Sequence, residues 1–577
     1  MDNKKIADSF EEIADLLEFQ GANPFRVRAY RKGSRTIRDL AQSVTTILED
    51  DRRKLTDVDG IGKDLAAKCA ELVETGQLEM LTELHREIPS TVLQLLRIPG
   101  LGPKKAAVLF RELNVQTLDQ LREACESDRV AGLKGFGKKT AETIFKGISL
   151  AAAANERIYW AEADHLVSQL REHLNLCQGI EQLEFAGSYR RGRETVGDLD
   201  ILVIANEADH VMDHLISFAE AAETIMRGGT KMSLRLHSGL QVDLRVVAAE
   251  SFGAALQYFT GSKDHNVVVR GRAKQRGLRI NEYGVYRSEG DEQVSIAGAT
   301  EHEVYECLGL PYIPPELRES RQEFEWADAD DLPDLLCLKD IRGDLHMHTN
   351  ATDGKGTIEE MIAAAKSRNL DYIAITDHSK RVSMARGLDA DRLLAQWKQI
   401  DRLRNSLEEG FQLLKGIECD ILEDGSMDLP DQVLAQADWV LASVHYGQKQ
   451  SRDQITDRII GAIRNPQITA IAHPTGRLIN RREAYDVDMD SVMQAAAECK
   501  TILELNANPA RLDLHDVHCA AAKSHGIQVA INTDAHSTSG MDVMCCGVLQ
   551  ARRGGLGPGD VANTRTWGEL SEWIASP

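Results

Sequence analysis

Asp344-Leu345-His346-Met347-His348-Thr349 opens the part of the chain that decides its fold, and Asn532-Thr533-Asp534-Ala535-His536 closes it. Between these two stretches lie further imidazole and carboxylate side chains: Asp353, His378, Glu418, His445 and His473. Most of them follow short apolar runs, such as residues 372–375 before His378 and 439–442 before His445. Such runs are typical of buried parallel strands. Ligands at the carboxyl ends of successive strands meet at one mouth of an α/β barrel.

The residue types of this set predict a metal centre. Imidazole and carboxylate together suit Zn²⁺, Mn²⁺ or Fe, and the set is larger than one ion needs. A single histidine is more often a packed or capping residue than a ligand, but that explanation cannot hold for all of them at strand ends. We therefore expect a multinuclear hydrolytic site, with Mn²⁺ or Zn²⁺, that turns bound water into hydroxide near neutral pH.

The chain of 577 residues implies several domains and carries a formal net charge of −22 at pH 7. Such a charge is unusual for a nucleic-acid binder, but residues 1–150 hold 24 basic and 24 acidic residues. Phosphate binding in that part would rely on local basic patches and backbone N–H groups.

The composition also predicts the compartment. Ten scattered cysteines without a CxxC pair fit reduced thiols. No stretch approaches the roughly 20 apolar residues of a membrane helix, and the first residues lack the apolar core of a signal peptide. We expect a cytoplasmic monomer without a membrane span.

One short motif occurs three times, at residues 58–63, 98–104 and 133–138. Each copy has two glycines around an apolar residue and then a basic residue that opens an expected helix. The glycines allow a tight turn, and the helix N-terminus offers N–H groups to a phosphate. One copy alone has an ordinary alternative as a helix C-cap, but three copies favour phosphate binding. The copies resemble helix-hairpin-helix motifs, which grip the DNA backbone without reading sequence. The residues expected at DNA are Gly60, Gly62, Gly100, Gly102, Lys104, Gly135, Gly137 and Lys138.

A second constellation lies between residues 187 and 243. Asp198 and Asp200 are two apart on an expected strand and share a face, and Asp243 projects from the polar face of another strand. Three carboxylates at one sheet surface repel unless cations neutralise them, and Mg²⁺ (or Mn²⁺) that bridges carboxylates and phosphates is the usual solution. Two ions about 4 Å apart would activate a hydroxyl and stabilise a departing pyrophosphate. For an isolated Asp-x-Asp the alternative is a solvated strand face. The residues just upstream that would hold a triphosphate are Gly187, Ser188 and Arg191.

These residues, together with Tyr-Phe-Thr-Gly-Ser at 258–262 and Ile-Asn-Glu-Tyr at 280–283, resemble the palm and thumb signatures of family X DNA polymerases, the polymerase β group. The likeness covers residues 1–318. It implies that Asp198, Asp200 and Asp243 hold the catalytic metals and that Asp243 accepts the proton of the primer 3′-hydroxyl. It also implies contacts to the nucleotide, its base or the template from Gly187, Ser188, Arg191, Gly197, Tyr258, Phe259, Gly261, Asn266 and Arg270.

The whole chain resembles the bacterial family X polymerases that carry a C-terminal PHP (polymerase and histidinol phosphatase) domain. That resemblance assigns nine metal ligands, and all nine are present as the expected residue type, which argues for retained hydrolysis. They are His346, His348, Asp353, His378, Glu418, His445, His473, Asp534 and His536.

We predict a multidomain protein with six parts. A helical N-terminal (8-kDa-like) domain covers residues 1–80, and helix-hairpin-helix fingers cover 81–150. An α/β nucleotidyltransferase palm covers 151–250, and a thumb covers 251–318. An acidic linker, 319–338, leads to the PHP metal-dependent hydrolase domain, 339–577, which is expected to be a distorted α/β (TIM-like) barrel.

Some residues fit the resemblance less well. In the polymerase β group a lysine of the first domain forms a Schiff base with an abasic sugar, and Lys68 occupies the matching place. Asp64 stands where that group has another lysine, and a nucleophilic lysine needs desolvation or cationic neighbours. We therefore favour a solvated helix lysine over lyase activity. His237, His265 and His515 match no motif, and we expect them at the surface.

The expected function is that of a bifunctional repair enzyme. The N-terminal half would fill short gaps in gapped or primed DNA with dNTPs. The resemblance implies that the barrel is a 3′→5′ exonuclease or phosphodiesterase that also acts at abasic or blocked ends. Three alternatives stay open: a barrel that is a small-molecule phosphatase, a non-catalytic scaffold at gaps, and nucleotide transfer to RNA or a small hydroxyl compound.

Overall fold

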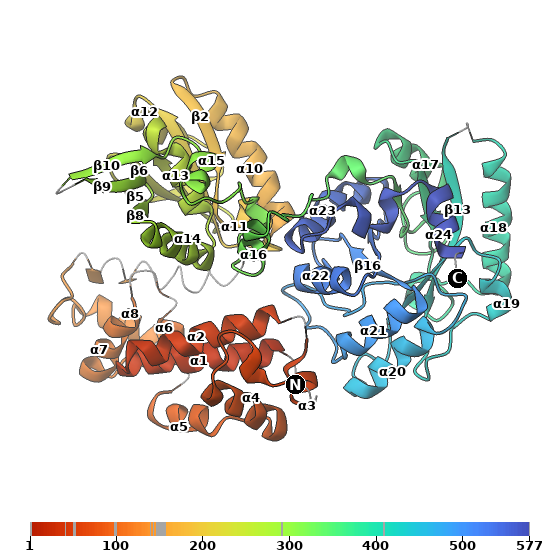
Figure 1. The fold of residues 1–577 in the computed structure, drawn as a ribbon, viewed down its shortest axis with the longest axis horizontal. Coiled ribbons are helices and arrows are strands. Elements are labelled where there is room, and N and C mark those ends of the chain that lie inside the picture. The colour runs from red at the N-terminus through yellow and green to blue at the C-terminus, as the bar shows by residue number, and fades with distance from the viewer. Residues whose placement is uncertain are drawn as a thin grey trace. The chain divides into compact units, whose positions relative to one another are not determined.

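The computed structural model describes residues 3–40, 42–49, 53–89, 91–96, 98, 101–138, 140–141, 144–145, 157–289, 292–407 and 410–575. The chain divides into two compact units, Met1–Arg157 and Ile158–Pro577. Figure 1 shows the elements of each unit. Among the described residues, no helix combines the length and the apolar character that crossing a bilayer requires.

The first unit is built from helices around one apolar core. Phe10, Ile13 and Leu16 of the first helix are fully buried in that core, and Phe10 meets Tyr30 edge to face at 5.7 Å. Asn23 caps the second helix by accepting the backbone N–H of Phe25. The described helices are α1 Asn3–Gln20, α2 Pro24–Asp39, α3 Val44–Glu49, η1 Leu55–Asp57, α4 Lys63–Thr75, α5 Glu79–Glu87, α6 Val92–Leu95, α7 Pro103–Leu113 and α8 Leu118–Glu126.

The second unit begins with a five-stranded sheet in the order β2-β4-β7-β6-β5, in which only β4 and β7 pair in parallel. Helices α10 and α12 pack on it, and both are drawn beside the sheet in Figure 1. The elements are β1 Ile158–Tyr159, α10 Trp160–Asn175, β2 Ile180–Phe185, α11 Gly187–Arg190, β3 Thr195–Val196, β4 Asp198–Ala205, α12 Ala208–Ile216, β5 Ala221–Arg227, β6 Lys231–Leu236 and β7 Gln241–Val246.

A smaller α/β part follows, with the antiparallel sheet β10-β9-β8. Its core includes Val269, Tyr305 and Leu308. The elements are η2 Ala249–Ser251, α13 Phe252–Thr260, α14 Lys263–Gln275, β8 Leu278–Asn281, β9 Gly284–Glu289, β10 Glu292–Ala297, α15 Glu301–Cys307, η3 Pro315–Leu317, α16 Glu323–Asp328 and η4 Leu338–Asp340.

The acidic segment 319–338 connects this part to the barrel, but it is packed rather than loose. Phe324, Ala327 and Leu335 are buried in the same core as Val269. A short helix, α16, lies within the expected linker. The acidic residues around its few apolar positions make the helix hard to recognise from the sequence.

His265 corrects the expectation of a surface residue. It is fully buried, with Nδ1 3.0 Å from Glu323 Oε1 and Nε2 2.8 Å from the Tyr305 hydroxyl, and its ring stacks on Phe324. His515 is half-buried, and its Nδ1 accepts backbone N–H groups at the start of a barrel helix. Only His237 of the three is exposed. A histidine within a helix is buried when neighbouring elements supply hydrogen-bond partners for its ring nitrogens. The residues next to it in the sequence do not reveal those partners.

The rest of the second unit is a barrel of seven parallel strands in sequence order, β11 to β17. Almost every strand residue is buried, as in a sheet covered on its outer face by helices. The strands are β11 Gly343–Asp344, β12 Tyr372–Ile375, β13 Gln412–Asp420, β14 Trp439–Ser443, β15 Ala470–Ile471, β16 Ile502–Asn506 and β17 Val529–Asn532.

The barrel closes where its first and last strands continue into loops. Met347 pairs with Ala535 in a parallel bridge, and the His348 backbone N–H donates to the Ala535 carbonyl at 2.8 Å. Helices lie around the strands, as Figure 1 shows for α17, α18 and α20 to α22. They are α17 Ile358–Ser367, η5 Ser383–Ala385, α18 Ala390–Arg404, α19 Asp431–Leu434, α20 Arg452–Ile463, α21 Met489–Cys499, α22 Asp516–Ser524, η6 Thr538–Val543, α23 Met544–Arg553, η7 Pro558–Asp560, η8 Ala562–Thr564 and α24 Trp567–Ala575.

Candidate active sites

The three carboxylates of the first candidate site lie side by side on the five-stranded sheet. Asp200 of β4 stands directly opposite Asp243 of β7, and Asp198 lies two residues earlier on the same face. Leu199 and Ile201 alternate with them and are fully buried on the other face. The expected cluster therefore forms through the parallel register of two strands.

Electrostatics at this cluster favour the binding of cations. Burial, together with the charges of Asp198 and Asp243, raises the pKa of Asp200 to about 7. Asp243 accepts the Gln241 side-chain amide at 3.0 Å and a hydroxyl hydrogen bond from Ser233, which fix its orientation. Carboxylates held together at this cost are the ligand type that Mg²⁺ or Mn²⁺ requires, so the residues present fit the expected ions.

The turn before these strands offers donors to an anion. Gly187 has a φ of +66°, and a Cβ at this position would lie 2.7 Å from Asp200 Oδ2, so only glycine fits. Ser188 Oγ is buried and has no hydrogen-bond partner among the described residues. Arg191, expected to reach the triphosphate, instead contacts Glu319 at 3.1 Å and donates to the Thr260 carbonyl.

Most other residues of the expected nucleotide site lie on α13 and α14 and the turn between them. The rings of Tyr258 and Phe259 meet edge to face at 5.1 Å. Asn266 is buried and donates to the Tyr258 carbonyl at 2.7 Å, so it braces these helices. Gly261 has a φ of +69° at the turn between them. The two remaining residues, which are exposed, are Gly197, just before β4, and Arg270, on α14.

The three glycine-rich motifs of the first unit form the same turn. The backbone N–H groups of Ile61, Leu101 and Phe136 donate to the carbonyls three residues earlier, each at 3.0 Å. In each copy the second glycine then accepts the first helical hydrogen bond, at 2.9 to 3.0 Å. Apart from the adjoining backbone, no atom of the described residues lies within 4 Å of a Cβ placed at the second glycines, so a ligand backbone can approach them. These second glycines are Gly62, Gly102 and Gly137.

The first glycines serve the turn itself. Gly60 and Gly135 have φ values of +91° and +90°, which disfavour any other residue. Lys104 and Lys138 are exposed at the following helix starts. The remaining expected residue, Gly100, lies outside the described residues.

Lys68 forms an ion pair with Asp64, which stands where the polymerase β group has another lysine. Its Nζ lies 2.7 Å from Asp64 Oδ1. Burial lowers the pKa of Lys68, but Asp64 and Tyr30 outweigh it and raise the pKa above the usual value. A protonated lysine is a poor nucleophile for Schiff-base formation.

The second candidate site lies at the carboxyl ends of the barrel strands. Eight of the nine expected ligands form three overlapping groups whose donor atoms lie within 4.8 Å of one another. The ninth, His473, has its Nε2 3.1 Å from Glu418 Oε1. His348 and His378 each belong to two groups, so the three groups form one continuous cluster. The groups are His348, Asp353, His378 and His536; His346, His348 and Asp534; and His378, Glu418 and His445.

Buried donor atoms in this site lack hydrogen-bond partners among the described residues. They are His346 Nε2, His348 Nδ1 and His473 Nδ1. Buried polar atoms without partners are rare, and bound ions are one way to satisfy them. Mixed imidazole and carboxylate donors of this kind fit Zn²⁺ or Mn²⁺.

The ligands also tune one another. Burial lowers the pKa of His378, but Glu418 and Asp353 outweigh it and raise the pKa to about 10. Burial and His378 lower the pKa of His348 to about 4. His473 and Asp534 adopt positive φ values, 30° and 54°, an uncommon conformation for residues other than glycine that is concentrated at functional sites.

Sequence reasoning missed the residues that orient the ligands. Glu504 is fully buried, lies 2.7 Å from His346 Nδ1 and accepts the backbone N–H of His473. Asp420 lies 3.2 Å from His445 Nδ1. Such contacts fix which ring nitrogen faces an ion. A carboxylate inside a buried strand is a usable signal, because Glu504 interrupts an apolar strand as Glu418 does.

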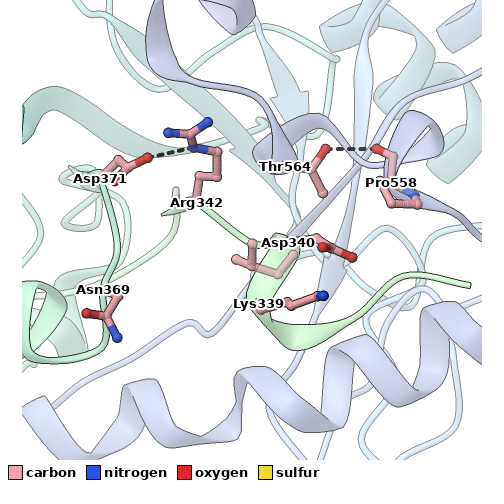
Figure 2. A pocket seen from close by; sticks show the side chains of 8 residues that line it. Lys339, Asp340, Arg342, Asn369, Asp371, Pro558 and Thr564 are labelled. Carbon is pink, nitrogen blue, oxygen red and sulfur yellow. Dashed lines mark hydrogen bonds and ion pairs between the residues drawn. The ribbon is translucent and has the colours of Figure 1, made fainter.

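A hollow of about 470 Å³ lies at the opposite end of the barrel, where the strands begin (Figure 2). Figure 2 shows the ion pair of Arg342 and Asp371 at its wall. None of the expected ligands lines it. In α/β barrels catalysis belongs to the carboxyl ends of the strands, so this hollow lies away from the candidate chemistry.

Comparison with protein families finds matches in several parts of the chain. The family models of the DNA polymerase beta palm and thumb match residues 157–241 and 255–319, and that of the PHP domain matches 344–507. The model of a helix-hairpin-helix domain matches residues 1–78, and that of a SAM-like helix-hairpin-helix tandem matches 92–148. The expected fold class is confirmed.

Among the curated relatives, one matches the whole chain and others match one part of it. The DNA polymerase/3′-5′ exonuclease PolX of Bacillus subtilis is 41% identical over 100% of this chain and 99% of its own length. A probable phosphatase of Thermoanaerobacter is 30% identical over 33% of this chain and 78% of its own length. DNA polymerase lambda of Rattus norvegicus is 24% identical over 55% of this chain and 56% of its own length. The chain therefore belongs to the family X DNA polymerases that carry a C-terminal PHP domain.

Proposed function

We propose that this protein is a DNA-directed DNA polymerase that fills short gaps during DNA repair, and that its barrel is a metal-dependent 3′→5′ exonuclease. The observation that carries the proposal is the presence, in one compact unit, of two separate ligand clusters suited to different ions. One is the carboxylate group of Asp198, Asp200 and Asp243, and the other is the nine-residue set of the barrel.

In the palm, the three carboxylates would hold two Mg²⁺ or Mn²⁺ ions. When bound, such ions acidify the primer hydroxyl and neutralise charge on the phosphates. Asp243 accepts the proton of the 3′-hydroxyl, in the orientation that Gln241 and Ser233 fix. The Ser188 hydroxyl and the N–H groups of the Gly187 turn bind the β- and γ-phosphates of a dNTP.

In the barrel, the nine ligands would hold Mn²⁺ or Zn²⁺. When bound, such ions acidify a water molecule and polarise the scissile phosphate. Arg511, with Nε 3.5 Å from Asp534 Oδ2, adds positive charge at the edge of the ligand set, where a DNA phosphate would arrive. Abasic and blocked 3′ ends are further substrates that we propose for the barrel.

The partners are gapped or primed DNA, gripped by the turns at Gly62, Gly102 and Gly137. Gly62 and Gly102 have negative φ values, which alanine also adopts, so alanine at either position leaves the fold intact. It places a methyl group where the DNA backbone approaches. We expect Gly62→Ala to weaken binding of gapped DNA several-fold with unchanged unfolding temperature.

Free cysteines support a reducing compartment, and we infer a cytoplasmic monomer.

A second candidate for the barrel is a small-molecule phosphatase, favoured by the similarity to the probable phosphatases. Hydrolysis rates on single-stranded DNA and on small phosphate monoesters discriminate between the two. The exonuclease proposal expects DNA to be the better substrate by kcat/KM, and the reverse order would replace it.

Two variants test the division of labour on a one-nucleotide-gapped duplex. Asp243→Ala is expected to abolish nucleotide addition and leave hydrolysis intact. His348→Ala combined with Asp534→Ala is expected to do the opposite. If either variant loses both activities while its unfolding temperature is preserved, the two reactions do not belong to separate centres.

A further inference from the structure

The polymerase's phosphate-binding turn is contacted by the barrel. Arg553, the last residue of barrel helix α23, donates from Nη1 to the Arg191 carbonyl at 2.7 Å. One helical turn earlier, Leu549 faces Gly192, where a Cβ would lie 3.3 Å from Leu549 Cδ2. Residues four apart share one face of a helix, so α23 presents both contacts to the same turn.

Arg553 also shares a partner with Arg191. Its Nη1 lies 2.9 Å from Glu319 Oε1, the same oxygen that Arg191 Nε contacts at 3.1 Å. Its Nη2 reaches Asp516 Oδ2 at 2.7 Å. The Arg553 side chain is only 2% exposed, so these bonds are shielded from solvent. The guanidinium fork therefore joins the barrel, the segment after the thumb and the backbone of the turn.

The charges of this cluster depend on one another. Burial alone would raise the pKa of Glu319, but Arg553, Arg191 and Arg193 outweigh it and hold the pKa at about 2. Glu319 thus remains ionised while two arginines divide its oxygen between them. Without Arg553, Glu319 would keep Arg191 and Arg193 as partners, but the Arg191 carbonyl would lose its bond to the barrel.

We propose that Arg553 is a positioning residue for the polymerase reaction: it holds the Arg191 carbonyl, and with it the backbone of the 187–192 turn, in place for the triphosphate. The nuclease domain is then a structural part of the nucleotide site. This inference rests on the proposed role of the Gly187–Arg191 turn in dNTP binding, and it adds a residue outside the polymerase domains to that site.

Arg552 provides a matched control on the same helix. It also ties the barrel to the preceding domain, through Glu316 Oε1 at 2.8 Å and the Leu336 carbonyl at 2.8 Å. No contact of Arg552 with the 187–192 turn is present among the described residues. A loss that stems only from loosening the domain boundary would appear in both variants.

The test compares Arg553→Gln, Arg553→Lys and Arg552→Gln in the full chain. Steady-state gap filling gives KM and kcat for the dNTP. Equilibrium titration of the same dNTP onto gapped DNA with a 3′-dideoxy primer gives its Kd without chemistry. We expect Arg553→Gln to raise KM and Kd at least fivefold with a smaller change in kcat, and to leave exonuclease activity within twofold. Arg552→Gln should leave KM and Kd within twofold.

Arg553→Lys is expected to give an intermediate rise, because lysine keeps the charge but lacks the fork that reaches two carboxylates and a carbonyl. It carries the test if Arg553→Gln does not fold. Equal dNTP Kd values for the Arg553 and Arg552 variants, or an unchanged Kd in the Arg553 variants, would overturn the inference. If the parent enzyme neither binds dNTP nor fills gaps, the proposed function fails instead.

Discussion

The two candidate metal centres bring charged side chains together in opposite ways. The palm brings together three carboxylates of like charge, of which Asp198 is exposed, and burial together with the repulsion raises the pKa of Asp200. The barrel alternates imidazoles and carboxylates, most of them buried, so that neighbours such as His378 and Glu418 stabilise each other's charges. The three carboxylates of the palm repel one another until ions bind between them and the substrate phosphates. The imidazoles and carboxylates of the barrel attract one another, so that site is preorganised for ions that stay bound. This difference suits exchange of metal with each nucleotide in the palm and retention of metal in the barrel.

The largest expected effect concerns the centre of the barrel site. Glu418 lies within 4 Å of five histidines, and Glu418→Gln keeps its shape while removing its charge. We expect exonuclease activity to fall on the order of 10³-fold, as removal of a central electrostatic group does. Gap filling should stay within twofold. Exonuclease activity within tenfold of the parent would contradict the central role of this carboxylate.

The next effect concerns the raised pKa of Asp200 in the palm. The pKa of Asp200 is about 7 in the folded protein, whereas its ordinary value is 3.8. Loss of the Asp200 proton therefore lowers the stability of the metal-free fold. The stability of the metal-free protein should therefore fall as pH rises from about 4 through 7, by at most about 4 kcal/mol from this group. Mg²⁺ should restore it at pH 8.

Asp200→Asn should remove both the pH dependence and the Mg²⁺ effect. Thermal unfolding of the metal-free parent and variant at pH 5 and pH 8 measures this. The same fall in unfolding temperature in both proteins would show that another group is responsible.

A smaller effect is expected from the residue that orients His346. Glu504→Gln should weaken metal binding in the barrel about 10- to 100-fold, the usual range for such supporting carboxylates. Mn²⁺ titration by calorimetry gives the affinity, and saturating Mn²⁺ should recover most exonuclease activity. Glu498→Gln, at an exposed position on α21, is the control. Unchanged Mn²⁺ affinity in Glu504→Gln would mean that His346 is oriented by other contacts.

The smallest effect is expected at Asp420. It orients His445, whose side chain is 19% exposed, and it also pairs with Arg381 at 2.9 Å. Because His445 is less enclosed than His346, Asp420→Asn should weaken metal binding by roughly tenfold or less. A loss larger than that of Glu504→Gln would reverse the ranking and locate the tightest ion near His445.

The two centres also differ in how far sequence reveals them. Alternation within β4 and β7 was enough to predict that Asp198, Asp200 and Asp243 face one surface, because strand periodicity fixes the side on which a residue lies. The ligands at the ends of the barrel strands were predicted for a similar reason. Their common feature is that local pattern determines position.

Features that depend on contacts between distant segments were not predictable. The bond between Glu504 and His346 joins residues 158 positions apart, and the burial of His265 depends on Glu323 and Tyr305. The engagement of Arg191 by Glu319 depends on how the segment after the thumb returns to the palm. Each of these requires the three-dimensional packing itself.

The closure of the barrel between Met347 and Ala535 bears on synthesis of the protein. Two of the three ligand groups need Asp534 or His536, which leave the ribosome almost 200 residues after His346. The carboxylates of the palm, by contrast, are all translated by residue 243. A nascent chain can therefore complete its polymerase ligands well before it can close the metal site of the barrel, and a premature stop before Asp534 would leave two of the three ligand groups incomplete.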